Sequence, residues 1–195
     1  MKKLLLAAVA LALVVAVASP SNAQGKMVWG VAVDVLIPTG TFGDAVSAGF
    51  GGDGRFQYGI TPMFAVHGTV GYFIWSGKDF TSGGITVKGA DFKGFTIRVG
   101  GKYYFMPEGG VRVYGLAEIG LFFSSTSVPS QTIGGFTFGG GSVSNTNFTY
   151  VPAVGVEIPA GPKLRIDLSV RYDGIATSGS SSGSLGFRAG VNFPI

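Results

Sequence analysis

Apolar and polar residues alternate along this sequence over segments of about ten residues, and this period of two constrains the fold more than any other feature. Successive side chains point to opposite sides of a β-strand, so such alternation is typical of strands with two different faces. The segment LRIDLSVRYD at residues 164–173 is an example. It places Leu, Ile, Leu, Val and Tyr on one face and Arg, Asp, Ser, Arg and Asp on the other.

Eight segments of this kind are separated by stretches rich in glycine, proline, serine and asparagine, and none has the spacing of an amphipathic helix. They lie near residues 27–37, 49–60, 63–75, 91–105, 111–124, 148–158, 163–173 and 183–193. Charged residues fall on the face opposite the aliphatic row, and all six arginines follow this rule. The sequence therefore predicts an all-β chain of eight antiparallel strands with one apolar and one polar face.

Two architectures use strands of this kind. A soluble barrel or sandwich turns its apolar rows inward and exposes charge to water. A membrane barrel turns the apolar rows to lipid and keeps the polar rows in its lumen. Only 12% of the residues are charged and 34 are glycine, whereas about a quarter of an ordinary soluble domain is charged. Polar rows rich in small residues suit a crowded lumen, so the composition favours the membrane barrel.

Aromatic residues of the apolar rows gather at the strand ends. One group comprises Trp29, Tyr58, Phe64, Tyr103, Phe105 and Phe193, and the other comprises Phe50, Tyr72, Phe95, Phe123 and Tyr172. Two aromatic girdles of this kind are typical of the two membrane–water interfaces.

The connectors between the segments also alternate in length. Those at 59–62, 106–110 and 159–162 are short, the others are longer, and the longest covers 125–147. With an even number of antiparallel strands, this places both chain ends and all short turns on one side. Outer-membrane barrels have short periplasmic turns and long extracellular loops, and closure leaves no strand edge unpaired in lipid. We therefore expect an eight-stranded antiparallel transmembrane up-and-down β-barrel.

Residues 1–23 have the pattern of a cleavable signal peptide. Two lysines precede 15 uninterrupted apolar residues at 4–18, and small residues follow at 21–23. A membrane anchor, the alternative interpretation, needs about 20 apolar residues. We expect cleavage after Ala23, export across the inner membrane, and a barrel domain at 24–195.

Five short stretches resemble a known family. They are IPTGTFGD at 37–44, GFGG at 49–52, YGITP at 58–62, VGY at 70–72 and FRAGVNF at 187–193. In these the chain is similar to the small outer-membrane β-barrel domain proteins of the OmpA/OmpX-like type. The resemblance implies outer-membrane lipid as the surroundings and insertion by the barrel assembly machinery. That machinery reads a terminal aromatic residue, and here Phe193 stands two places before the final Ile195.

Charged residues of the polar rows are predicted to form a network in the lumen. Its members are Asp34, Asp53, Arg55, Arg98, Lys102, Arg112, Glu118, Glu157, Arg165, Asp167, Arg171 and Arg188. An eight-stranded barrel is just wide enough for side chains to fill it, and an unpaired charge there is costly. We expect Arg98 and Glu118, on adjacent strands, to pair. The network is either a salt-bridged plug that fixes strand register or a narrow gated pore whose pairs exchange partners.

The longest loop contains candidate contact residues. It has no charge, but Ile133, Phe136 and Phe138 stand among glycine, serine and threonine. Residues 132–138 alternate enough to extend a hairpin beyond the membrane, which would offer an unknown extracellular partner an edge for strand addition. The alternative is a neutral loop that simply faces the medium.

Residue content disfavours several other classes of chemistry. Without cysteine there is no disulfide, thiol nucleophile or thiolate metal site, and a single histidine allows no multi-histidine centre, so we expect no cofactor and no metal. The net charge of +4 falls to +2 once the two leader lysines are removed, which excludes a basic surface for nucleic acid. In lipid A deacylase barrels the catalytic His is followed two residues later by Ser, whereas His67 is followed by Thr69. We interpret His67 as a member of the lumen network.

These observations predict a non-enzymatic integral outer-membrane protein with a structural or surface-contact role through its long loops. The alternatives are a narrow pore for ions or small solutes, a lipid-modifying barrel enzyme, and a soluble secreted barrel.

Overall fold

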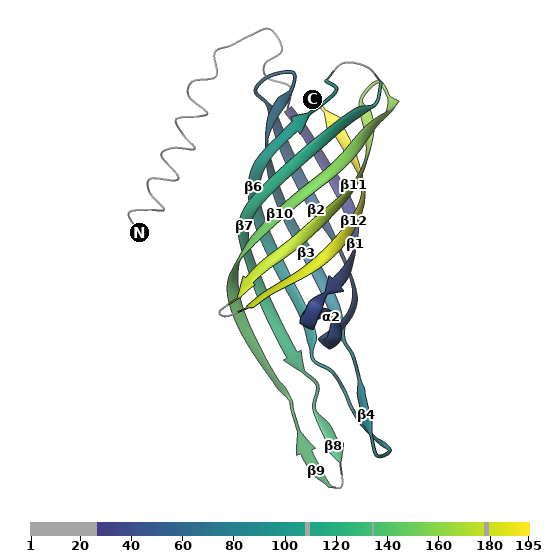
Figure 1. Cartoon of the computed structure of the whole chain (residues 1–195), viewed down its shortest axis with the longest axis vertical. Coiled ribbons are helices and arrows are strands. Elements are labelled where there is room, and N and C mark those ends of the chain that lie inside the picture. Colours follow the sequence, from purple (N-terminus) through teal and green to yellow (C-terminus); the bar gives the residue numbers. More distant parts are fainter. Residues whose placement is uncertain (1–26, 108–109, 134, 178–179) are drawn as a thin grey trace, which may run out of the picture.

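Eight long strands close into an antiparallel barrel in the order β1-β12-β11-β10-β7-β6-β3-β2, as Figure 1 shows. The structure is a computed structural model and describes residues 27–107, 110–133, 135–177 and 180–195. The expected signal peptide at 1–23 lies outside these residues. The barrel strands are β1 (Met27–Thr39), β2 (Val46–Gly59), β3 (Phe64–Gly77), β6 (Asp91–Tyr104), β7 (Arg112–Val128), β10 (Gly141–Gly161), β11 (Leu164–Thr177) and β12 (Ser180–Pro194).

The orientation of the strand faces confirms the membrane-barrel prediction. In β1, Val33 is 67% exposed on the outer surface, whereas its neighbours Ala32 and Asp34 are buried inside. The same alternation of exposed apolar and buried polar side chains recurs in the other barrel strands. A soluble barrel would show the opposite pattern, so the outer surface is apolar and the interior is polar.

The two ends of the barrel differ. Short turns join β2 to β3 and β10 to β11 at the end where Met27 and Ile195 lie, which we call the turn end. At the loop end stand a short helix, α2 (Gly40–Ala45), and two small hairpins, β4 (Phe80–Ser82) with β5 (Ile85–Val87) and β8 (Gln131–Ile133) with β9 (Phe136–Phe138). In Figure 1 the two hairpins extend below the barrel, and α2 lies at its lower end. No helix in the described ranges is long and apolar enough to cross a membrane.

The departures from the sequence expectations include the hairpin of β4 and β5, a short helix and longer strands. The helix α2 is six residues long, too short to show helical periodicity, and no helix was expected. Strand β10 spans 21 residues rather than 148–158, because Ser, Asn and Thr continue its pairing with β7 as far as Gly141 and Val128. Pro152 pairs with Ala117 of β7, whereas the ladder to β11 passes from Tyr150 directly to Ala153. Proline has no backbone N–H, so it cannot donate a ladder hydrogen bond to β11 at this position.

Candidate functional site

The inward rows bring oppositely charged side chains together along the barrel axis. Among the described residues, six carboxylates and six Lys or Arg cations make contacts of ion-pair length. The carboxylates are Asp34, Asp53, Glu118, Glu157, Asp167 and Asp173, and the cations are Arg55, Arg98, Lys102, Arg112, Arg171 and Arg188. The two sets balance, so the network carries no net charge when all twelve groups are ionised.

The part of the network near the turn end is centred on Lys102. Its Nζ donates to Glu157 Oε1 at 2.6 Å, lies 3.4 Å from Asp167 Oδ2, and sits 3.7 Å from the centre of the Tyr114 ring. Arg112 donates to the other oxygen of Glu157 at 2.5 Å. Lys102 and Glu157 are 1% exposed, so their contacts with each other replace the hydrogen bonds that they would form with water.

The middle of the network is organised around Asp53. Arg55 Nη1 reaches Asp167 at 3.1 Å while its Nε lies 3.5 Å from Asp53, which links this part to the Lys102 region. Arg188 donates to Asp53 and, through Nε, to Asp34 at 3.0 Å. Arg171 Nη1 also approaches Asp53 at 3.5 Å. One carboxylate therefore meets three guanidinium groups.

The part near the loop end contains the pair expected from the sequence. Arg98 Nε lies 3.6 Å from Glu118 Oε2, and Arg98 Nη1 donates to Asp173 at 2.7 Å. Asp173 Oδ2 also forms an ion pair with Arg171, whose Nε lies 2.7 Å away. Asp173 was not among the candidates, although its position on the polar row of β11 was the signal that could have identified it.

His67 lies inside the barrel rather than at a reactive surface. Its Nδ1 is 2.8 Å from Glu118 Oε1, and Thr69 Oγ1 donates to the same oxygen at 2.5 Å. Both His67 and Thr69 are 2% exposed. His67 therefore belongs to the charge network, as interpreted from the sequence.

Arg165 was expected to belong to the network, but it forms no ion pair with a described carboxylate. It stands on the inward row, but at the turn end, where it is only partly buried and donates to the backbone oxygen of Gly110 at 3.4 Å. Within the described part of the chain it contacts no carboxylate. The first residue pairs of β11 lie near the turn end, where Arg165 is the strand partner of Pro159.

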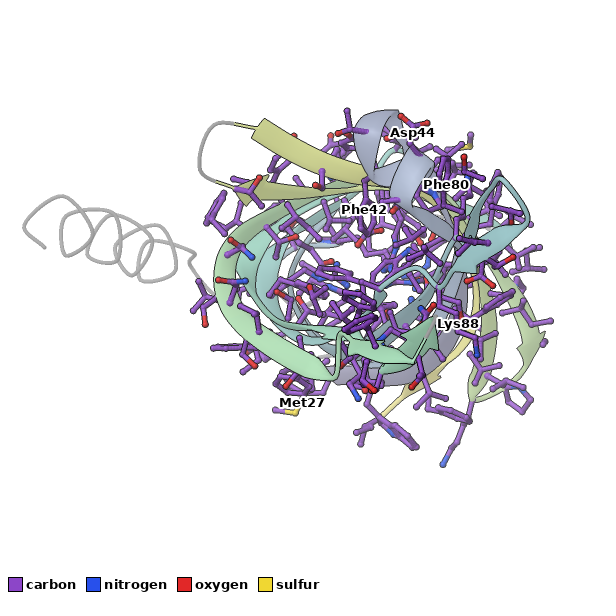
Figure 2. The ribbon with its side chains drawn as sticks, turned by 90° about the horizontal axis from the view of Figure 1, so that it is seen from below. Met27, Phe42, Asp44, Phe80 and Lys88 are labelled. Atoms are coloured by element: carbon purple, nitrogen blue, oxygen red, sulfur yellow. The ribbon has the colours of Figure 1, made fainter. Side chains whose placement is uncertain are left out.

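An apolar cluster, which we call the cap, closes the lumen at the loop end, between the ion pairs and the extracellular loops. It consists of Leu36, Val46, Phe73, Trp75, Phe122 and Ile175, with Phe42 and Phe92 packed against it. Phe42 of α2 meets Trp75 and Phe92 edge to face, with ring centres 5.7 and 5.3 Å apart. Seen from the loop end, Figure 2 places Phe42 over the interior of the strand ring and Asp44 at its outer edge. Sequence reasoning missed the cap, because Phe73 and Trp75 share their row with His67 and Thr69.

Cavities lie at both ends of the barrel. At the turn end, one of about 540 Å³ is lined by Tyr104, Arg112, Arg165 and several prolines. At the loop end, one of about 480 Å³ lies over the cap. The cavity beside Trp75, Arg98 and Asp173 measures only about 10 Å³. A cavity of this size holds at most about one water, so the side chains of Trp75, Arg98 and Asp173 are closely packed around it.

The two small hairpins share a sequence pattern. Both contain a Gly-Gly turn flanked by threonines, in TSGGIT at 81–86 and TIGGFT at 132–137. The hydroxyls of Thr81 and Thr86 are 2.9 Å apart, and those of Thr132 and Thr137 are 3.1 Å apart. Phe80 and Phe136 are 68% and 71% exposed. Each hairpin thus has a hydroxyl face and exposed apolar side chains.

The candidate loop residues lie in the second of these hairpins. Phe136 and Phe138 are exposed, and Phe136 is the strand partner of Ile133. The alternation at 132–138 does form a hairpin beyond the barrel, and its role in contacts stays a prediction.

Comparison with known proteins identifies the family. The family model of the outer membrane protein beta-barrel domain matches residues 7–193. Comparison with curated protein sequences gives no match.

Solved structures with a similar fold include three small outer-membrane barrels. Neisserial surface protein A is 18% identical, with a TM-score of 0.62 over 88% of this chain and 100% of that one. The outer membrane protein OprG of Pseudomonas aeruginosa is 12% identical, with a TM-score of 0.57 over 88% and 96%. Ail, the attachment invasion locus protein of Yersinia pestis, is 16% identical, with a TM-score of 0.52 over 90% and 100%. The chain belongs to the outer membrane protein beta-barrel domain family and is an integral protein of the cell outer membrane.

Proposed function

We propose that this protein is a closed, non-conducting barrel that holds its extracellular hairpins in place for contacts at the cell surface. The observation that carries the proposal is the contrast between the two parts of the molecule. The interior is filled by balanced ion pairs and closed by the cap, whereas the hairpins at the loop end expose apolar side chains.

The lumen supports the non-conducting part of this proposal. A conducting filter needs sites that an ion can enter and leave, with ring charges or carbonyl groups facing an open path. Here the charged groups face each other, as in the contacts of Lys102 with Glu157 and of Arg98 with Asp173. Breaking such a buried pair leaves an uncompensated charge, which opposes exchange of partners.

The hairpins support the contact part. Apolar residues exposed at a surface in a contiguous group mark interaction sites more often than scattered ones do. Phe136, Phe138 and Val143 lie along one extension of the β7–β10 hairpin and are all more than half exposed. Ail, which has a similar fold, is named for attachment and invasion, and this makes a surface-contact role a natural hypothesis.

The burial of His67 supports a role without catalysis. A lipid substrate reaches a barrel from its outer surface, whereas His67 Nδ1 faces the lumen and is held by Glu118. We also propose that residues 1–23 act as a cleaved leader and that the barrel assembly machinery inserts the barrel. The exposed apolar rows of the strands and the aromatic girdles support the insertion.

Two measurements test the proposal. In planar lipid bilayers, the folded protein should give no stable conductance steps, and reproducible steps would overturn the closed barrel. Cells expressing the protein should adhere to polystyrene, an apolar probe surface, more strongly than cells with empty vector.

The double variant F136S/F138S should return that adhesion to the vector level, because it removes apolar area. The matched control T132S/T137S changes only the hydroxyl face and should adhere like the parent. Equal adhesion of F136S/F138S and the parent would contradict the contact role.

A further inference from the structure

The cavity at the loop end has a divided lining. Its floor is apolar and is formed by Val46 and Ile175 of the cap together with Phe42 and Phe92, which pack against the cap. Its wall is polar and uncharged, and comes from Ser124, Thr126, Asn145, Asn147, Thr177 and Ser182 on β7, β10, β11 and β12. At about 480 Å³ it is within the range of about 300–1,000 Å³ found for small-molecule sites.

Two asparagines of the wall, Asn145 and Asn147, have unused hydrogen-bonding capacity. The side-chain amides of Asn145 and Asn147 form no hydrogen bond with any described residue, and both stand on the inward row of β10 that continues to Thr149. Each amide offers two donors and an acceptor. Ser124 Oγ, by contrast, donates to the backbone oxygen of Asn145. The two amides are therefore free to bind a ligand.

The lining selects one class of ligand by chemistry. Among the described residues, no arginine, lysine, aspartate or glutamate lines this cavity, so no described side chain in it would balance a phosphate, a carboxylate or an ammonium group. A purely apolar chain would displace water from the amides without replacing its hydrogen bonds, which loses affinity. A neutral sugar ring fits both halves, because it has an apolar C–H face for the floor and hydroxyls for the wall.

We propose that this cavity binds a neutral saccharide of one or two rings from the extracellular side. Phe42 and Phe92 pack against its C–H face, and Asn145 and Asn147 bond to its hydroxyls. The cap closes the cavity below through Trp75, so the sugar is held at the mouth and is not conducted. This site goes beyond the proposed surface contacts, since the hairpin residues Phe136 and Phe138 do not line it.

Saturation-transfer NMR on the folded protein in phosphocholine nanodiscs tests this inference, because sugar-headed detergents would compete. The probes are methyl β-D-glucopyranoside and maltose, with glucose 6-phosphate and 1-octanol as contrasting ligands. We expect saturable binding of at least one neutral sugar and weaker binding of both contrasting ligands. No transfer to either neutral sugar, or tighter binding of octanol, would overturn the proposal.

Three variants locate the site. Asn145→Ala and Asn147→Ala should each weaken binding by about threefold to tenfold, the value of one neutral hydrogen bond. Ser144→Ala is the matched control, because Ser144 is exposed on the opposite row of the same strand. The shift in gel mobility on boiling shows that each variant is folded. If folded Asn145→Ala and Asn147→Ala both bind like the Ser144→Ala control, the sugar lies elsewhere and the assignment of this cavity is wrong.

Discussion

Lys102 Nζ donates to Glu157 Oε1 at 2.6 Å, although their strands, β6 and β10, are separated in the barrel by β7. The bond therefore spans an intervening strand inside the lumen. Contacts of this type tie distant parts of the wall to one another, which the backbone ladders between neighbouring strands do not do.

Lys102→Met should lower the free energy of unfolding by roughly 3–5 kcal/mol, because it leaves Glu157 and Asp167 as buried charges that have lost a partner. Denaturant unfolding in detergent micelles, followed by the gel-mobility shift, measures this change. Lys163→Met is the control, since Lys163 is exposed in the turn before β11. Equal stability of both variants would show that the lumen pairs contribute little.

Arg188→Met should destabilise the barrel more than Asp34→Asn does. Arg188 contacts both Asp34 and Asp53, and methionine in its place offers neither carboxylate a hydrogen bond. Asp34→Asn removes one charge and keeps a hydrogen-bonding group of the same shape. Thermal midpoints of the two variants, measured side by side in the same lipid, test this order, and the reverse order would contradict it.

Trp75→Ala should reduce stability by about 3–5 kcal/mol, the usual cost of truncating a large buried aromatic residue. Trp75 is 4% exposed and contacts Phe42, Phe73, Phe92 and Phe122. Conductance should stay absent, because the Arg98–Asp173 pair lies directly beneath the cap. Conductance steps in this variant alone would mean that the cap, and not the ion pairs, closes the barrel.

The topology predicts which insertions reach the cell surface. A short epitope between Gly83 and Gly84 should be accessible to antibody on intact cells, because this turn joins β4 to β5 at the loop end. Both glycines have positive φ angles, of 59° and 80°, and a Cβ at either would meet no described atom within 4 Å, so the turn projects into open space. The same epitope between Gly161 and Pro162 should react only after the cells are permeabilised. Reaction at both sites, or the reverse pattern, would invert the assigned topology.

The strand alternation was sufficient to predict the barrel and its inside-out polarity, because burial of one face leaves a period of two in every strand. It could not predict partners such as Lys102 and Glu157, since contacts across the lumen depend on how the whole ladder is staggered. The same limit applies to Arg165, whose row was right but whose depth placed it at the rim.

The interior was also less uniform than its polar rows suggested. His67 and Thr69 lie on one row with Phe73 and Trp75, and the change from polar to aromatic along it marks where the ion pairs end and the cap begins. The helix that contributes Phe42 has a single turn and leaves no periodic signal. The cap could be identified only once strands far apart in the chain were placed side by side.

Asp34 of β1 and Arg188 of β12 are direct partners in the register of the first and last strands. A nascent chain that lacks β12 has two open edges, and it carries Asp34 and Asp53 without Arg188, one of the two guanidinium groups that contact both of them. Neutralisation of the interior and closure of the wall therefore both depend on β12, the last barrel strand in chain order. A truncated product would be marked by exposed charge, and this gives the cell a physical basis for distinguishing finished barrels from incomplete ones.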